Sequence, residues 1–250
     1  MTAVLEAREL GRAFGALQAV GGVSFAVEPG ELRAVIGPNG AGKTTLFHLI
    51  SGLLAPTAGR VFFRGDDVTT LSAPARCRRG ISRTFQITSI FPELTVLENV
   101  RIGVQLKTHG NFRLLGGRAL IDASERRARE ELRALGLLDR ADEPAATLPH
   151  GDQRLLEIAM AVAQEPALLL LDEPTQGLSP EDTVATVEVI RRIARERALT
   201  ILLVEHDMDV VFDLADRISV LHFGRLIAEG RPDEIRANAE VQTAYLGGVD

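Results

Sequence analysis

The segment GPNGAGKTT, residues 37–45, carries groups that can bind phosphate. Gly37 and Gly42 frame a loop, and Lys43 and Thr44 follow it directly. Glycines let backbone N–H groups turn towards a phosphate because no Cβ stands in the way. This is the P-loop pattern, in which the lysine contacts the β- and γ-phosphates of a nucleotide and the hydroxyl holds Mg²⁺. The segment therefore predicts a site for a nucleoside triphosphate.

A second set of chemical groups follows a wholly apolar run. Residues 167–171, with the sequence ALLLL, suit a strand that is buried on both faces of a parallel sheet. Asp172 and Glu173 come next, at the end of the strand where α/β proteins bind their ligands. Asp172 is predicted to hold Mg²⁺ through water, and Glu173 to polarise an attacking water. The alternative, a solvated acidic turn, would leave a carboxylate beside a buried strand without compensation.

One histidine differs from the others by its position. Residues 201–204 form a third apolar run, and His206 follows it. Because parallel strands end at the same edge of a sheet, we expect His206 near Asp172 and Glu173. A lone histidine is usually structural. Three others are placed in that class: His48, His109 and His222.

The surrounding elements must bring these groups together. Residues 32–36 predict a strand before the phosphate loop, and residues 44–53 predict a helix after it. A chance match in a glycine-rich turn would not need these flanks. Residues 1–30 and 59–65 predict an antiparallel layer, and a hairpin is expected to turn at Gly224. Together these patterns favour an α/β fold around a P-loop core.

Helical patterns fill much of the remaining chain. Residues 90–156 predict inserted helices, for which Thr95 and Asp122 are candidate starts. Residues 107–117 break the pattern and predict a loop, either solvated or in contact with membrane components. Ser179, followed by proline and two acids, predicts the cap of a further helix.

Composition narrows the class of protein. The net charge of −6 at pH 7 argues against nucleic-acid binding, because a phosphate backbone normally attracts a basic face. The single cysteine, Cys77, cannot form an internal disulfide, which suits the cytosol. No apolar run approaches the ~18 residues of a membrane span. We therefore expect a soluble chain that can still dock on a membrane partner.

Taken in chain order, these motifs resemble the nucleotide-binding subunit of an ABC transporter over essentially the whole chain. The resemblance implies a RecA-like ABC ATPase core with an antiparallel β layer and an inserted α-helical subdomain. It also implies that Phe14 stacks on adenine and that Gln86, in SRTFQ, contacts Mg²⁺ and faces the membrane partner. Residue 206 then becomes the switch histidine that contacts the γ-phosphate, and residues 179–182 stand at the D-loop.

The implied site residues fall into three sets, with ATP and Mg²⁺ as the ligands. The catalytic residues are Glu173, His206 and Gln86. The ATP-binding residues are Phe14, Gly37, Asn39, Gly40, Ala41, Gly42, Lys43, Thr44 and Thr45. The Mg²⁺ ligands are Thr44, Gln86 and Asp172.

The segment LPHGD stands where the family has its signature, Leu-Ser-Gly-Gly-Gln, which acts in trans on the ATP of a partner subunit. Leu148 and Gly151 are kept. Pro149 has neither a hydroxyl nor an N–H group, whereas His150 can supply a donor. Asp152 favours a helix start but brings negative charge towards a negative ligand. Either the site completed on the partner is weaker, or the altered turn ahead of a helix from residue 153 is tolerated.

Within this family, the chain resembles the ATP-binding subunits of branched-chain amino-acid importers. The stretch ISRTFQITSIFPELTVLENV and the region around LLVEHDMDVVFDLADRISVLHFGRLIAEG carry that likeness. The resemblance implies a second ATPase subunit (identical or different), two transmembrane permeases and an external solute-binding protein. It places the chain in the cytoplasm, peripheral on the inner face of the cell membrane. One ABC ATPase domain is expected over residues 1–250, with 1–89 and 157–250 as the core and 90–156 as the helical subdomain.

Three other interpretations stay open on the sequence. An exporter ATPase, for example one that moves lipopolysaccharide, has a very similar subunit. A soluble ABC ATPase acting on ribosomes or DNA usually has tandem domains or coiled-coil insertions. A P-loop kinase or GTPase would not require Glu173 beside Asp172, nor His206.

Overall fold

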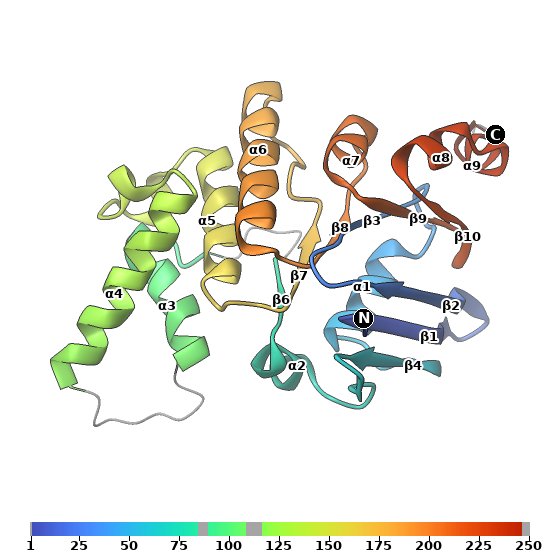
Figure 1. Cartoon of the computed structure of the whole chain (residues 1–250), viewed down its shortest axis with the longest axis horizontal. Helices are drawn as coiled ribbons and strands as arrows, with labels where there is room; N and C mark the ends of the chain where they lie inside the picture. Colours follow the sequence, from blue (N-terminus) through green and yellow to red (C-terminus); the bar gives the residue numbers. More distant parts are fainter. Residues whose placement is uncertain (1, 85–89, 109–116, 247–250) are drawn as a thin grey trace.

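A computed structural model describes residues 2–84, 90–108 and 117–246. A six-stranded sheet with the order β10-β9-β3-β8-β7-β6 runs through its centre (Figure 1). The strands are β3 (Leu32–Ile36), β6 (Ile81–Arg83), β7 (Leu168–Asp172), β8 (Ile201–Val204), β9 (Arg217–His222) and β10 (Arg225–Gly230). The pairs from β9 to β6 are parallel, and β10 pairs antiparallel with β9. The predicted strands at residues 32–36 and 201–204 and the hairpin at Gly224 are confirmed.

The central strands are apolar because both faces of the sheet are covered. Every residue of β3, β7 and β8 is buried. Alternate residues contribute to two separate cores: Leu169 and Leu171 face one, whereas Leu168 and Leu170 face the other. Since side chains alternate along a strand, continuous apolar runs are the expected pattern for such a sheet.

A second, antiparallel sheet with the order β2-β1-β4-β5 packs beside the core, as predicted from residues 1–30 and 59–65. Its strands are β1 (Leu5–Phe14), β2 (Leu17–Val27), β4 (Ala58–Phe63) and β5 (Asp66–Asp67). Helix α1 (Lys43–Ser51) lies between the two sheets (Figure 1), and its apolar residues join the core of the antiparallel layer. The fold is therefore α/β with an antiparallel layer.

Helix α2 (Ala73–Arg79) packs near the end of α1, where Arg76 donates to the carbonyls of Leu49 and Ile50. The remaining helices cover the other face of the central sheet and extend beyond it. They are α3 (Val96–Thr108), α4 (Gly117–Ala134), α5 (His150–Val162), α6 (Pro180–Arg197), α7 (Met208–Leu214), α8 (Pro232–Ala237) and α9 (Ala239–Leu246). Short 3-10 turns occur at Leu138–Arg140 and Ala145–Thr147. Helices α3 and α4 lie at the end of the molecule farthest from the antiparallel sheet (Figure 1). None of the helices in the described ranges has the length and apolar character needed to cross a membrane.

Helix starts follow capping chemistry in two of the three predicted cases. Thr95 precedes α3, where its hydroxyl accepts a hydrogen bond from the N–H of Glu98, and the Glu98 carboxylate accepts one from the N–H of Thr95. Ser179 caps α6 by accepting from the N–H of Asp182. The predicted start at Asp122 is wrong, because α4 already begins at Gly117. The intervening Arg, Ala and Leu are good helix formers and extend the helix backwards.

The predicted division into a core and a helical subdomain stays a prediction. Helix α5 is continuous across the expected boundary at residue 156. The predicted loop at residues 107–117 falls mostly outside the described residues.

Candidate functional site

The phosphate loop connects β3 to α1 and is packed against neighbouring backbone. A Cβ at Gly37 would overlap the carbonyl group of Leu221, and a Cβ at Gly42 would overlap the carbonyl group of Ala19. Gly42 also has a φ of 100°, which disfavours any side chain. These two positions therefore require glycine for packing as well as for access to a ligand.

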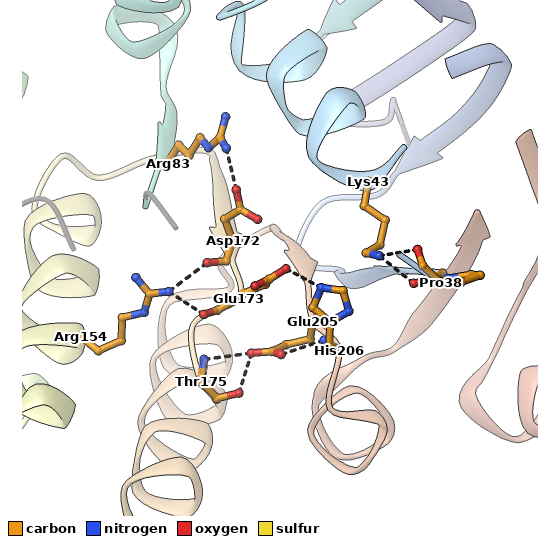
Figure 2. A network of polar contacts seen from close by, with 10 residues as sticks. Pro38, Lys43, Arg83, Arg154, Asp172, Glu173, Thr175, Glu205 and His206 are labelled. Atoms are coloured by element: carbon orange, nitrogen blue, oxygen red, sulfur yellow. Dashed lines mark hydrogen bonds and ion pairs between the residues drawn. The ribbon is translucent and has the colours of Figure 1, made fainter. Parts of the chain in front are cut away.

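Lys43 is the first residue of α1, and its side chain folds back over the loop. Its ammonium donates to the carbonyl oxygens of Gly37 at 2.7 Å and Pro38 at 3.0 Å (Figure 2). Burial lowers the pKa of Lys43, and the charge of Glu173 partly opposes that shift. The positive charge is thus held at the mouth of the loop, where a phosphate can replace the two carbonyls.

A cavity of about 400 Å³ opens above this loop. Residues 39–45 of the loop line it together with Glu173 and His206. Residues 17–19 of β2 and the exposed Phe223 complete its walls. The volume lies in the usual range for small-ligand sites. The loop and the two chemical groups that the sequence places far from it therefore share one cavity.

Glu173 and His206 point towards each other across the ends of β7 and β8 (Figure 2). The His206 Nε2 lies 2.6 Å from the Glu173 Oε1, and the carboxylate is nearly buried while the imidazole is partly exposed. Glu173 has a φ of 48°, a left-handed conformation that is rare outside glycine. Its N–H nevertheless donates to the carbonyl of Val204 at 2.8 Å, so the neighbouring strand fixes this turn.

A buried acid supports the histidine. Glu205 accepts hydrogen bonds from the hydroxyl of Thr175 at 2.6 Å and from its N–H at 2.9 Å. It also accepts from the N–H of His206 at 2.9 Å. The turn after β7 is therefore tied to the turn after β8. Glu205 was not predicted as a site residue, although its position between an apolar strand and His206 indicates burial.

A buried arginine ties α5 to the end of β7. The guanidinium of Arg154 donates to the carbonyl oxygens of Asp172 at 3.1 Å, Glu173 at 2.5 Å and Pro174 at 3.2 Å. It also pairs with Glu157 at 2.6 Å, and both side chains are 3% exposed. Arg154 was not predicted as a site residue. The available signal was its position four residues before the buried Ile158, on the inner face of the helix.

Asp172 lies beside the cavity but does not line it. Its Oδ2 lies 2.6 Å from the Nη2 of Arg83, and the two side chains are 2% and 8% exposed. Mg²⁺ usually binds through one or two carboxylates together with phosphate oxygens and water. Asp172 and the Thr44 hydroxyl are donors of that kind. Among the described residues, no group of three or more His, Cys, Asp and Glu side chains forms a metal site of its own.

The two aromatic residues near the cavity differ from expectation. Phe14 ends β1, is 44% exposed and stacks on the guanidinium of Arg12 at 4.7 Å. It does not line the cavity, although Leu17, its partner in the β1–β2 pair, does. Phe223, which the sequence analysis missed, does line it. Gln86 lies outside the described residues.

The segment at residues 148–152 forms the beginning of α5. The predicted turn with a helix from residue 153 is wrong, because α5 starts at His150 with Pro149 as its N-cap. Asp152 stabilises this earlier start because it lies in the first turn, near the positive end of the helix dipole. It also pairs with Arg140 at 3.2 Å, which reduces its negative charge towards a ligand. A Cβ at Gly151 would lie 2.9 Å from the Asp182 carboxyl carbon, so any larger residue there would require the Asp182 side chain to shift.

Comparison with known proteins gives two matching family profiles. The profile described as "ABC transporter" matches residues 20–176. A second, described as "Branched-chain amino acid ATP-binding cassette transporter", matches residues 225–250. The chain is thus similar to this class of proteins in both its phosphate-loop region and its C-terminal region.

Individual relatives and structures agree over nearly the full length. The chain is 42% identical to the high-affinity branched-chain amino acid transport ATP-binding protein LivG of Escherichia coli K12, covering 94% of each chain. It is 38% identical to BraF of Pseudomonas aeruginosa, which has the same description, covering 98% of each. The ADP conformation of MJ1267, an ATP-binding cassette of an ABC transporter, superimposes with a TM-score of 0.85 at 29% identity, covering 99% of this chain and 100% of that one. A dimeric structure of the bacterial ABC transporter cassette MJ0796 gives a TM-score of 0.78 at 26% identity, covering 91% and 98%.

Proposed function

The chain belongs to the ABC transporter family as one of its ATP-hydrolysing cassettes, and from that premise we propose that it powers the import of branched-chain or related amino acids. The observation that carries the chemical part is the single cavity shared by residues 39–45, Glu173 and His206. The transported substrate is inferred from the printed descriptions of LivG and BraF and from the matching C-terminal profile.

We assign the chain's own residues the following roles. Backbone N–H groups of residues 39–45 and the ammonium of Lys43 bind the β- and γ-phosphates. Mg²⁺, when bound, neutralises phosphate charge, and Thr44, Asp172 and Gln86 are the residues proposed to hold it. Phe14, at the turn that joins β1 to β2, is proposed to contact the adenine.

Glu173 is the proposed base for the hydrolytic water. Its carboxylate is nearly buried and carries a hydrogen bond from His206, so its orientation is fixed before substrate arrives. His206 is partly exposed at the cavity, which leaves its ring able to contact a γ-phosphate as well. The buried Glu205 holds the histidine's backbone in place. Proton transfer from water to Glu173 accompanies attack of the water oxygen on the γ-phosphorus, and the bond from that phosphorus to the β–γ bridging oxygen breaks, with ADP as the leaving group.

The proposed assembly contains a second ATPase subunit, identical or different, whose site is closed by residues 148–152 of this chain. The start of α5 supports this role because His150 is exposed and begins the helix. Two permeases and an external binding protein complete the proposed importer, with the chain peripheral on the inner membrane face. Pro149 and His150 are proposed to make the partner's site weaker than one closed by serine and glycine.

Reconstitution tests the proposed transport function. The chain is purified from membranes with its permease partners, inserted into liposomes loaded with ATP, and supplied with the external binding protein. Uptake of labelled leucine that requires both ATP and the binding protein is the expected result. Uptake should be lost with Glu173→Gln and kept with Glu196→Gln, an exposed acid on α6. Co-purification with an export permease, without leucine uptake, would contradict the proposal.

A further inference from the structure

The predicted metal ligand Asp172 already has a cationic partner in the structure. The guanidinium of Arg83 lies 2.6 Å from its Oδ2, and both side chains are nearly buried. Figure 2 shows Arg83 reaching Asp172 from the side opposite Glu173. A buried carboxylate is costly without a compensating charge, and this contact supplies one.

The position of Arg83 is fixed by the elements around it. Arg83 is the last residue of β6 and pairs with Leu170, two residues before Asp172 at the end of β7. A second guanidinium nitrogen donates to the hydroxyl of Ser51 at 3.1 Å, at the C-terminal end of α1. The ring of Phe47, also on α1, lies 5.8 Å from the guanidinium carbon. The guanidinium therefore lies between the helix that begins at Lys43 and the strand that ends at Asp172.

Arg83 and a metal ion would place two cations on one small, buried carboxylate. Like charges at that distance repel strongly where water is scarce, so one cation weakens the binding of the other. Asp172 also lies outside the cavity lining while it is paired with Arg83. A metal held by this carboxylate, directly or through water, is therefore expected to weaken the contact between Asp172 and Arg83.

We propose that Arg83 is a positioning residue that neutralises Asp172 until Mg²⁺ arrives with the nucleotide, and that its guanidinium competes with the metal for this carboxylate. The inference rests on the proposed Mg²⁺–ATP site.

The test measures how much Mg²⁺ strengthens nucleotide binding. The Kd of a non-hydrolysable ATP analogue is determined by calorimetry in EDTA and in excess Mg²⁺. The Kd in EDTA divided by the Kd in Mg²⁺ is the gain in affinity from the metal. In Arg83→Gln the ratio should rise about tenfold, because Mg²⁺ no longer displaces a charged hydrogen-bond donor. An unchanged or lower ratio would overturn the inference, since it means that Arg83 is structural or holds Asp172 ready for the metal.

Two further variants keep the result interpretable. Arg197→Gln removes a pair of equal length, 2.6 Å to the buried Glu131, and should leave the ratio unchanged. If Arg83→Gln does not fold, Arg83→Lys carries the test. A lysine keeps the charge but loses the planar donor pair, so the ratio should rise by only about threefold. A ratio that does not rise would again contradict the inference.

The failures of the two proposals are distinguishable. If Mg²⁺ gives the wild-type protein no gain in nucleotide affinity, the Mg²⁺–ATP site itself is wrong. If the wild type gains and Arg83→Gln does not exceed it, only the role of Arg83 is wrong.

Discussion

The phosphate loop, residues 37–45, and the acidic edge, which is Asp172 and Glu173 at the end of β7, meet at the same cavity. Different parts of the chain hold them in place. Lys43 is fixed by carbonyls five and six residues away along the chain. Asp172 and Glu173 are fixed by Arg83, Arg154 and His206, which come from β6, α5 and the end of β8. Lys43 is thus anchored locally, whereas the acidic edge depends on tertiary charge pairing. Changes in the loop should affect nucleotide binding, and changes at the edge should affect hydrolysis or stability.

The largest difference between the effect on ATP hydrolysis and the effect on ATP binding is expected for Glu173→Gln. Removing the proposed base should lower the ATP hydrolysis rate of the assembled complex by about 10²–10⁴-fold. ATP binding should persist because the phosphate loop is untouched. Phosphate release and equilibrium ATP binding are measured on the same preparation, with Glu196→Gln as an exposed control. Equal losses of binding and hydrolysis would contradict the division of roles.

Arg154→Met should disrupt the acidic edge and lower the free energy of unfolding. The change removes the guanidinium partner of the buried Glu157 and the donors to the carbonyls of Asp172 and Glu173. The free energy of unfolding should fall by roughly 3–5 kcal/mol, measured by denaturant titration. The control is Arg140→Met, whose guanidinium is 42% exposed. It should cost less than about 1 kcal/mol, and similar costs for the two variants would refute the assigned difference.

Lys43→Ala tests the loop. It removes a charged donor from the phosphates and should weaken the binding of a non-hydrolysable ATP analogue by about 10–100-fold. Unfolding stability should change little, since the displaced partners are loop carbonyls. Lys107, the other lysine of the chain, is exposed on α3 and provides a matched control as Lys107→Ala. If Lys43→Ala binds the analogue as tightly as the wild type, the proposed role of the loop in nucleotide binding is wrong.

The smallest expected effect belongs to the segment that acts on the partner. The double change Pro149→Ser with His150→Gly should raise the ATPase rate of the assembled complex by up to about tenfold, because a hydroxyl and an unhindered N–H become available. Serine is also a better N-cap than proline. The rate is measured on the reconstituted complex at saturating ATP. An unchanged rate would mean that the altered turn is tolerated and that the pairing of Asp152 with Arg140 suffices.

The same contrast explains what could be predicted from the sequence. Residues 37–45 are contiguous, and the strand and helix that flank them have clear periodicity. Their common role in phosphate binding can therefore be predicted from the sequence alone. The strands that end at Asp172 and near His206 were also predicted, because continuous apolar runs indicate burial on both faces. Their meeting at one edge then followed from the parallel topology.

The charges that hold the acidic edge were not predictable in the same way. Arginine is usually exposed, and nothing local distinguishes Arg83 from the many other arginines of the chain. The position of Arg154 on the inner face of its helix indicates burial but does not reveal its partners. Only the packing of β6 and α5 against β7 shows their partners. The early start of α5 was missed for a related reason: Pro149 was interpreted as a turn residue, although proline is tolerated at a helix beginning.

The most direct test is a structure of Glu173→Gln crystallised with Mg²⁺ and ATP. The account predicts that the β- and γ-phosphates replace the carbonyls of Gly37 and Pro38 at the Lys43 ammonium, with residue 173 facing the γ-phosphate. It also predicts a longer separation between Arg83 and Asp172 than 2.6 Å. Nucleotide bound away from Lys43, or a γ-phosphate remote from residue 173, would contradict the central claim.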